Sequence, residues 1–172
     1  MEELEVDYVI RDGRHLSIRP LKASDEQAWL DFVNGLSPDS SYHRFFQVLK
    51  DFTHRDIGHY LDIDPEKRVA IIAATPGPRG RIVAIARYER VPDTKTGEFA
   101  IVVADDFQDK GIGTFLLNRL TAFARSKGID KFVAEVLTDN DHMMELFRNS
   151  GLRMESKHES GTRLVRLFLD DS

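Results

Sequence analysis

Apolar and polar positions alternate in short runs near the beginning of the chain, a pattern typical of β-strands. Two such runs, Tyr8–Ile10 and His15–Ile18, flank the dipeptide Asp12-Gly13. Both central residues of a tight hairpin turn need positive φ, and Asp-Gly is one of the pairs that adopt it readily. The chain is therefore predicted to begin with a β-hairpin.

The apolar spacing then changes to three and four residues, which indicates helices. The first helix is predicted over 24–35, where Ser24 and Gln27 form a capping box. A second helix is predicted from Ser37-Pro38, because proline fits the first position of a helix. A third, short helix is predicted over 53–61.

Three runs in the middle of the chain are rich in valine, isoleucine and alanine, and they are predicted to be strands: Arg68–Ala74, Arg81–Tyr88 and Glu98–Val103. The proline- and glycine-containing segments 76–80 and 92–97 separate them. Connections this short favour antiparallel neighbours.

The last third of the chain mixes both patterns. It predicts a helix from Gly113 to Lys127, a strand over Lys131–Leu137, a helix over 140–150, and a closing hairpin of Leu152–His158 and Thr162–Leu169. The unit from Glu98 to Leu137 is strand, helix, strand, so its two strands should be parallel and its connection right-handed.

This order of elements predicts an α+β (mixed α/β) fold: a mostly antiparallel central sheet with one parallel strand pair and helices on both faces. We expect a single domain over 1–172, since the length suits one domain. Its parts are an N-terminal hairpin (1–20), a helical segment (21–66), the central sheet with a glycine-containing loop (67–137), and a C-terminal helix and hairpin (138–172).

The composition excludes several classes of function. The chain has no cysteine, which rules out disulfides, thiolate nucleophiles and cysteine-ligated zinc. Its formal net charge of −5 argues against nucleic acid as a main partner. The N-terminus lacks a secretory signal, and the apolar runs are far shorter than the roughly 18 residues of a membrane span. We therefore expect a cytoplasmic protein with no membrane contact, and no metal site, because His54 and His59 are poorly spaced for one ion.

The segment that carries chemistry is Gln108-x-x-Gly111-x-Gly113, which lies between a strand and a helix. Glycines let a ligand approach the backbone closely, and the first N–H groups of a helix have no partners inside it. Such a loop can hold a pyrophosphate with backbone groups alone. A Walker P-loop is rejected because Thr114-Phe115 replaces its Lys-Ser/Thr, and a Rossmann site fits poorly because Leu116 replaces its third glycine.

The loop resembles the Q/R-x-x-G-x-G/A signature of the GNAT acetyltransferases, and the order of elements is similar over nearly the whole chain. The segment Ser37-Pro38-Asp39-Ser40-Ser41-Tyr42-His43-Arg44-Phe45-Phe46 narrows the resemblance to the catalytic domain of bacterial Pat-type protein lysine acetyltransferases. This resemblance implies that a bulge at the end of Glu98–Val103 splays this strand from Lys131–Leu137, and that acetyl-CoA places its pantetheine arm in the gap.

The resemblance also implies which residues bind acetyl-CoA: Ile101, Val102, Val103, Gln108, Asp109, Lys110, Gly111, Ile112, Gly113, Thr114 and Asn140. Glu98 would be the general base that takes a proton from the attacking amine. A tyrosine that protonates the leaving thiolate in many relatives is replaced by Phe147, for which we expect a position in the core.

The leading hypothesis is an N-acetyltransferase that acts on a primary amine, with protein lysine as the first candidate. Without cysteine, transfer should proceed by direct attack in a ternary complex and not through an acetyl-enzyme. The alternatives are a small-amine acetyltransferase and a non-catalytic module that senses acyl-CoA. Both a monomer and a homodimer remain open.

Overall fold

The computed structural model of the protein describes residues 2–36, 61, 63–78 and 80–170. Its strands are β1 (Val6–Val9), β2 (His15–Pro20), β3 (Arg68–Ala74), β4 (Ile82–Arg90), β5 (Thr96–Val103), β6 (Lys131–Leu137), β7 (Arg153–Glu159) and β8 (Thr162–Phe168). Its helices are α1 (Glu26–Asn34), α4 (Ile112–Ser126) and α5 (Asp141–Asn149), with short 3-10 turns at η1 (Glu2–Leu4), η2 (Ala23–Asp25) and η3 (Asp105–Phe107). The helix predicted from Ser37-Pro38, most of the helix predicted over 53–61, and the segment 37–46 lie outside the described residues.

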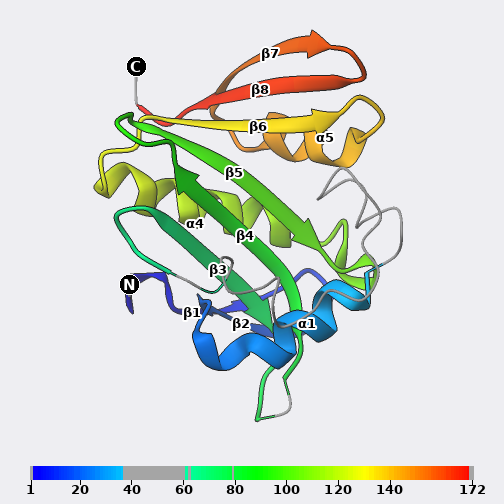
Figure 1. Ribbon diagram of the computed structural model, residues 1–172. Helices are drawn as coiled ribbons and strands as arrows, with labels where there is room; N and C mark the ends of the chain where they lie inside the picture. The colour runs from blue at the N-terminus through cyan, green and yellow to red at the C-terminus, as the bar shows by residue number, and fades with distance from the viewer. Residues whose placement is uncertain (1, 37–60, 62, 79, 171–172) are drawn as a thin grey trace.

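All eight strands form one sheet in the order β1-β2-β3-β4-β5-β6-β8-β7. Neighbouring strands are antiparallel except for β5 and β6, which are parallel, as predicted. Figure 1 shows α1 on the face toward the viewer, and α4 and α5 behind the sheet. The predicted fold class, a mostly antiparallel sheet with one parallel pair and helices on both faces, is confirmed.

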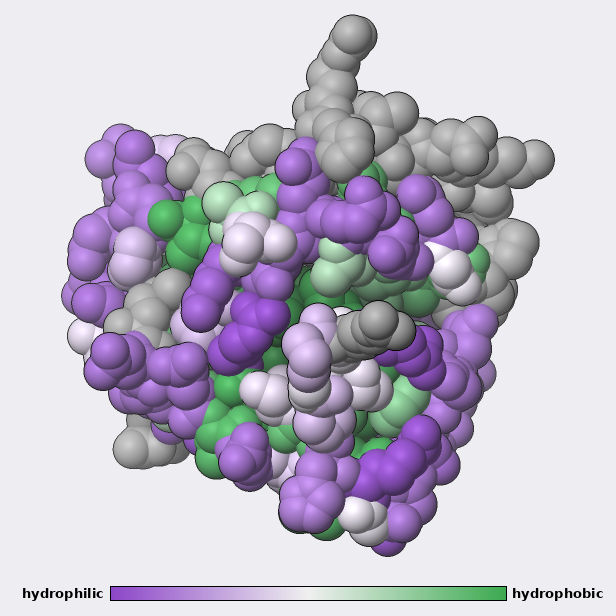
Figure 2. All heavy atoms as spheres, turned by 90° about the horizontal axis from the view of Figure 1, so that it is seen from below, coloured by the Kyte–Doolittle hydropathy of each residue, from purple (hydrophilic) through white to green (hydrophobic). Residues whose placement is uncertain are grey.

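The core is centred on β3 and β4, whose side chains are buried on both faces of the sheet. The apolar side of α4, with Leu116, Leu117 and Leu120 fully buried, covers one of these faces. The edge strand β7 differs from these central strands, because almost all of its residues are exposed. Seen from below in Figure 2, hydrophilic side chains cover most of the surface, and hydrophobic atoms show mainly in the recesses between them.

The start of α1 differs from the prediction. Ser24 does not cap the helix, because the residue at the N-cap is Asp25 and a 3-10 turn precedes it. The Asp25 carboxylate accepts two hydrogen bonds from the guanidinium of Arg19, at 2.7 and 2.8 Å, and one from the Lys22 N–H at 2.8 Å. Burial favours the neutral form of this carboxyl, but the bonds from Arg19 and Lys22 outweigh it and lower the pKa of Asp25 from its ordinary 3.8.

We expect Asp25→Asn to lower the free energy of unfolding at pH 7 by about 1–2 kcal/mol, because it removes a charged, buried acceptor. A lowered pKa stabilises the fold above pH 3.8, and this contribution is lost as the pH falls through the lowered value. The difference between wild type and variant should therefore shrink at pH 3. Urea unfolding at both pH values measures it, and an equal difference at both would contradict the assigned role of Asp25.

Candidate functional site

The site is located where the two parallel strands separate. β5 and β6 pair with each other over Thr96–Glu98 and Lys131–Val133. Beyond this point β5 continues to Val103 and β6 to Leu137, but the two strands no longer pair with each other. Figure 1 shows the two strands diverging from this point. The predicted splayed pair is therefore present.

Two backbone N–H groups of β5 point into the gap that this divergence opens. The N–H of Ala104 donates to the carbonyl of Val83 at 2.8 Å, which makes these residues a hydrogen-bonded antiparallel pair. Bonded and non-bonded pairs alternate along such a ladder. Ile101 and Val103 are therefore in non-bonded pairs with β4, and their N–H groups face the side from which β6 has departed.

The prediction of a bulge at the end of β5 is wrong. The register between β4 and β5 runs unbroken from the pair of Gly97 with Arg90 to the pair of Val103 with Ala84. The irregularity lies on the other side of β4, where Ala73 pairs with Ala84 but Ala74 pairs with Ile82. The gap thus follows from the loss of β6 as a partner and needs no bulge within β5.

The loop after β5 leads directly into the N-terminus of α4. Gly111 is the N-cap, and its φ of 86° is in the left-handed region that favours glycine. A glycine has no side chain with which to cap the helix, and the first turn of α4 contains no acidic residue. The first N–H groups of α4, those of Ile112, Gly113 and Thr114, precede the first helical hydrogen bond and are available to a ligand.

The two glycines of the loop motif have different roles. Gly111 supplies the positive φ, and a Cβ at this position would lie 3.6 Å from the hydroxyl of Tyr8. Gly113 has no such backbone requirement, but a Cβ there would collide with the side chain of Leu146 on α5. The second glycine therefore lets α5 approach the first turn of α4.

Gln108 fastens the loop to the strand before it. Its side-chain amide donates to the carbonyl of Val103 at 3.0 Å and more weakly to Asp105 at 3.4 Å. This contact holds the loop beside the last residue of β5. The predicted coenzyme-binding residues of β5 and those of the loop therefore lie side by side on one surface.

A cleft of about 630 Å³ runs along this surface between the loop, the start of α4 and α5. Ten of the predicted coenzyme-binding residues line it: Ile101, Val102, Val103, Gln108, Asp109, Gly111, Ile112, Gly113, Thr114 and Asn140. Lys110 does not line the cleft, because its ammonium group points to Asp12, 4.0 Å away. The remaining predicted residue, Glu98, lies outside the cleft as well.

A narrow hollow of about 30 Å³ extends the cleft into the gap between the strands. It is lined by the β5 segment 99–101 and the β6 segment 134–136, and it shares Ile101, Asn140 and Met143 with the cleft. The hollow ends close to the pair Glu98–Val133, where the two strands join. A long, thin group could therefore reach from the start of α4 to the closed end of the gap.

Glu98 lies at this closed end but on the other face of the sheet. The neighbouring Phe99 is buried and meets Phe147 of α5 edge to face, with ring centroids 6.1 Å apart. Successive side chains of a strand point to opposite faces, so Glu98 faces away from α5, and it is exposed. Val102 shares the face of Glu98 and Ile101 shares that of Phe99, and both residues line the cleft where β5 has lost β6 as a partner.

Two predictions concern α5. Phe147 is fully buried, which confirms its predicted place in the core. Asn140 caps α5, since its side-chain oxygen accepts from the N–H of Met143 at 3.2 Å. The amide nitrogen of Asn140 is thus the side-chain group left to face the cleft.

Several lining residues were missed by sequence reasoning. Arg11 comes from the turn of the N-terminal hairpin, and His142 and Leu146 come from α5. The Asp-Gly turn signal located the hairpin but carries no information on what the turn contacts. Tertiary packing brings it to the cleft, through the stacking of Tyr8 on Phe115 of α4 with ring centroids 3.9 Å apart.

Among the described residues, no group of three or more histidine, aspartate or glutamate side chains is placed to hold a metal ion. In the same part of the chain, no helix combines the length and the apolar character that crossing a bilayer requires.

Comparison with known proteins gives consistent matches. The acetyltransferase (GNAT) family matches residues 28–152. Acetyltransferase PA5475 of Pseudomonas aeruginosa is 28% identical over 155 residues, which cover 90% of this chain and 83% of that protein. Acetyltransferase Pat of Mycolicibacterium smegmatis is 32% identical over 143 residues, which cover 83% of this chain but 42% of Pat. The chain thus corresponds to less than half the length of Pat.

Solved structures agree. The GNAT domain of S. lividans PAT superimposes with a TM-score of 0.88 at 28% identity, covering 98% of both chains. Spermidine N-acetyltransferase from Vibrio cholerae, in complex with CoA and spermine, shares the fold with a TM-score of 0.67 at 14% identity, covering 89% of this chain and 94% of that one. The chain therefore belongs to the GNAT family of acetyltransferases and is an N-acetyltransferase.

Proposed function

We propose that the protein transfers the acetyl group of acetyl-CoA to the ε-amine of a lysine in a protein substrate. The observation that carries this proposal is the cleft that starts at the first N–H groups of α4, which have no backbone partner among the described residues, and continues into the gap between β5 and β6. Lysine is put before other amines because the loop motif and the segment 37–46 resemble those of Pat-type protein lysine acetyltransferases.

The residues of the cleft fit a pyrophosphate followed by a thin arm. The N–H groups of Ile112, Gly113 and Thr114 would donate to the pyrophosphate, the cleft would hold the pantetheine arm, and the narrow hollow would receive the small acetyl end. The coenzyme supplies the acetyl group in activated form, as a thioester. The N–H groups of Ile101 and Val103 would donate to the acetyl oxygen as it gains negative charge, a contribution of about 3–4 kcal/mol per well-placed donor.

The amine would enter from the opposite face of the sheet, where Glu98 is exposed. A lysine ammonium titrates near 10.4, so deprotonation at pH 7 costs roughly 4.6 kcal/mol. Glu98 would accept this proton, directly or through one water. Glu135 of β6 is exposed on the other side of the gap. A cationic amine entering there would therefore meet one carboxylate on β5 and one on β6.

The leaving thiolate needs no acid from the position of Phe147. A thiol titrates near 8.5, so its thiolate is a tolerable leaving group at neutral pH and can take its proton from water. This is compatible with the buried, apolar environment of Phe147.

An acceptor panel tests the proposal. Lysine-containing peptides, peptides with a free N-terminus but no lysine, polyamines and small primary amines are each incubated with acetyl-CoA, and release of CoA thiol is measured. We expect lysine peptides to give the highest kcat/KM. A higher kcat/KM with polyamines or small amines would contradict lysine as the acceptor. Tight acetyl-CoA binding without transfer to any amine would contradict the proposal that the protein transfers acetyl groups.

A further inference from the structure

The charge of the cleft is poorly matched to a phosphate-rich ligand. Among the described residues that line it, four are carboxylates: Asp109, Asp139, Asp141 and Glu145. Arg11 is the only lysine or arginine among these lining residues. A coenzyme with a pyrophosphate and a 3′-phosphate needs positive charge to offset this repulsion.

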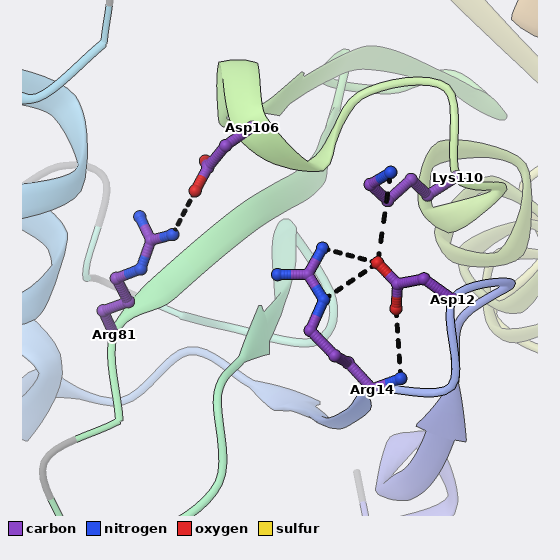
Figure 3. A network of polar contacts seen from close by, with 5 residues as sticks. All are labelled: Asp12, Arg14, Arg81, Asp106 and Lys110. Atoms are coloured by element: carbon purple, nitrogen blue, oxygen red, sulfur yellow. Dashed lines mark hydrogen bonds and ion pairs between the residues drawn. The ribbon is translucent and has the colours of Figure 1, made fainter.

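The other cations beside the loop are already engaged, as Figure 3 shows. Arg14 and Lys110 both contact Asp12, at 2.7 and 4.0 Å, and Arg81 contacts Asp106. Hydrogen bonds from Arg14 lower the pKa of Asp12, which keeps this carboxylate charged as their partner. Within the described part of the chain, the guanidinium of Arg11 has no such carboxylate partner.

Arg11 is also held in a suitable place. A Cβ on Gly111 would lie 3.7 Å from Nε of Arg11 and 3.8 Å from Nη2, so the guanidinium lies directly against the loop. Two contacts fasten the hairpin that carries it: Tyr8 stacks on Phe115, and the guanidinium of Arg14 lies 4.2 Å from the ring centre of Phe107.

We propose that Arg11 is a coenzyme-recognition residue, which binds an ionised phosphate of CoA beside Gly111 and supplies the positive charge that no other lysine or arginine among the described lining residues provides. This inference rests on the proposed use of acetyl-CoA. A guanidinium can donate two parallel hydrogen bonds to one phosphate, which adds geometry to charge. The N-terminal hairpin thereby becomes part of the coenzyme site.

Titration calorimetry of wild type, Arg11→Ala and Arg11→Lys with CoA, 3′-dephospho-CoA and pantetheine tests this inference. We expect Arg11→Ala to weaken CoA binding about 10-fold or more, the size of a lost charged hydrogen bond, and Arg11→Lys to restore part of it. If the loss disappears with 3′-dephospho-CoA, Arg11 binds the 3′-phosphate. If the loss persists there and disappears with pantetheine, Arg11 binds the pyrophosphate.

Arg81→Ala is the matched control, because it removes one positive charge beside the same loop from a residue that does not line the cleft. We expect it to change CoA affinity less than twofold. An equal loss in Arg81→Ala and Arg11→Ala, or an equal loss with pantetheine and CoA, would overturn the inference. If wild type binds CoA and Arg11→Ala binds it equally well, only this inference fails, whereas a wild type that does not bind CoA would overturn the proposed function itself.

Discussion

Glu98→Gln is expected to slow acetyl transfer to a lysine peptide at pH 7 by about 100-fold or more, the usual range for loss of a general base. Glutamine has nearly the same shape, but it cannot accept the proton that the lysine ammonium must lose. The rate of the variant should recover as the pH rises, because the fraction of neutral amine grows tenfold per unit up to about pH 10. The Kd for CoA should stay unchanged, because Glu98 lies outside the cleft.

Glu155→Gln provides the control for this experiment. Glu155 is also an exposed strand carboxylate, but it lies on the edge strand β7, away from the gap. We expect this variant to keep the wild-type rate. If Glu98→Gln also keeps the wild-type rate across the pH range, Glu98 takes no part in proton transfer.

Gly111→Val is expected to weaken CoA binding about 100-fold, through loss of two charged hydrogen bonds from the start of α4. A β-branched residue is strongly disfavoured at the φ of 86° that Gly111 adopts. The added methyl groups would also meet Tyr8 and Arg11, whose nearest atoms lie 3.6 and 3.7 Å from the position of a Cβ. The loop must therefore move, and its N–H groups lose their alignment toward the cleft.

Gly128→Val separates this effect from general destabilisation. Gly128 follows the other end of α4, and its φ of 83° gives the same backbone strain far from the loop. Thermal unfolding should show similar losses of about 1–3 kcal/mol for both variants, while calorimetry should show weaker CoA binding only for Gly111→Val. Equal CoA affinity of the two variants would contradict the role of the loop in holding the coenzyme.

The elements of the fold were largely predictable, because each has its own local pattern. β3 and β6 have the predicted limits, since each is an apolar run with clear ends. The β4–β5 hairpin is longer than predicted: the Val91 N–H bonds to the carbonyl of Thr96 at 2.9 Å, so pairing continues into the polar residues beside the turn. Backbone pairing does not depend on side-chain polarity. The apolar pattern therefore predicted strands that end before the pairing ends.

Contacts between distant segments were harder to predict. Ser24 has a good capping sequence, but Asp25 is the N-cap of α1, and its carboxylate is held by the Arg19 guanidinium from β2. The glycine loop indicated the position of the cleft, whereas Arg11 reaches it only because the hairpin packs on Phe107 and Phe115. Such contacts depend on tertiary packing, which leaves no mark in local periodicity.

The most direct measurement of the proposed function follows both products of one reaction with acetyl-CoA and a lysine peptide. Release of CoA thiol is compared with the amount of acetyl found on the lysine ε-amine by mass spectrometry. We expect the two amounts to be equal, and thiol release to depend on the peptide, because the amine attacks directly without an acetyl-enzyme. Thiol release without peptide acetylation, or no release with any lysine peptide, would contradict acetyl transfer to protein lysine.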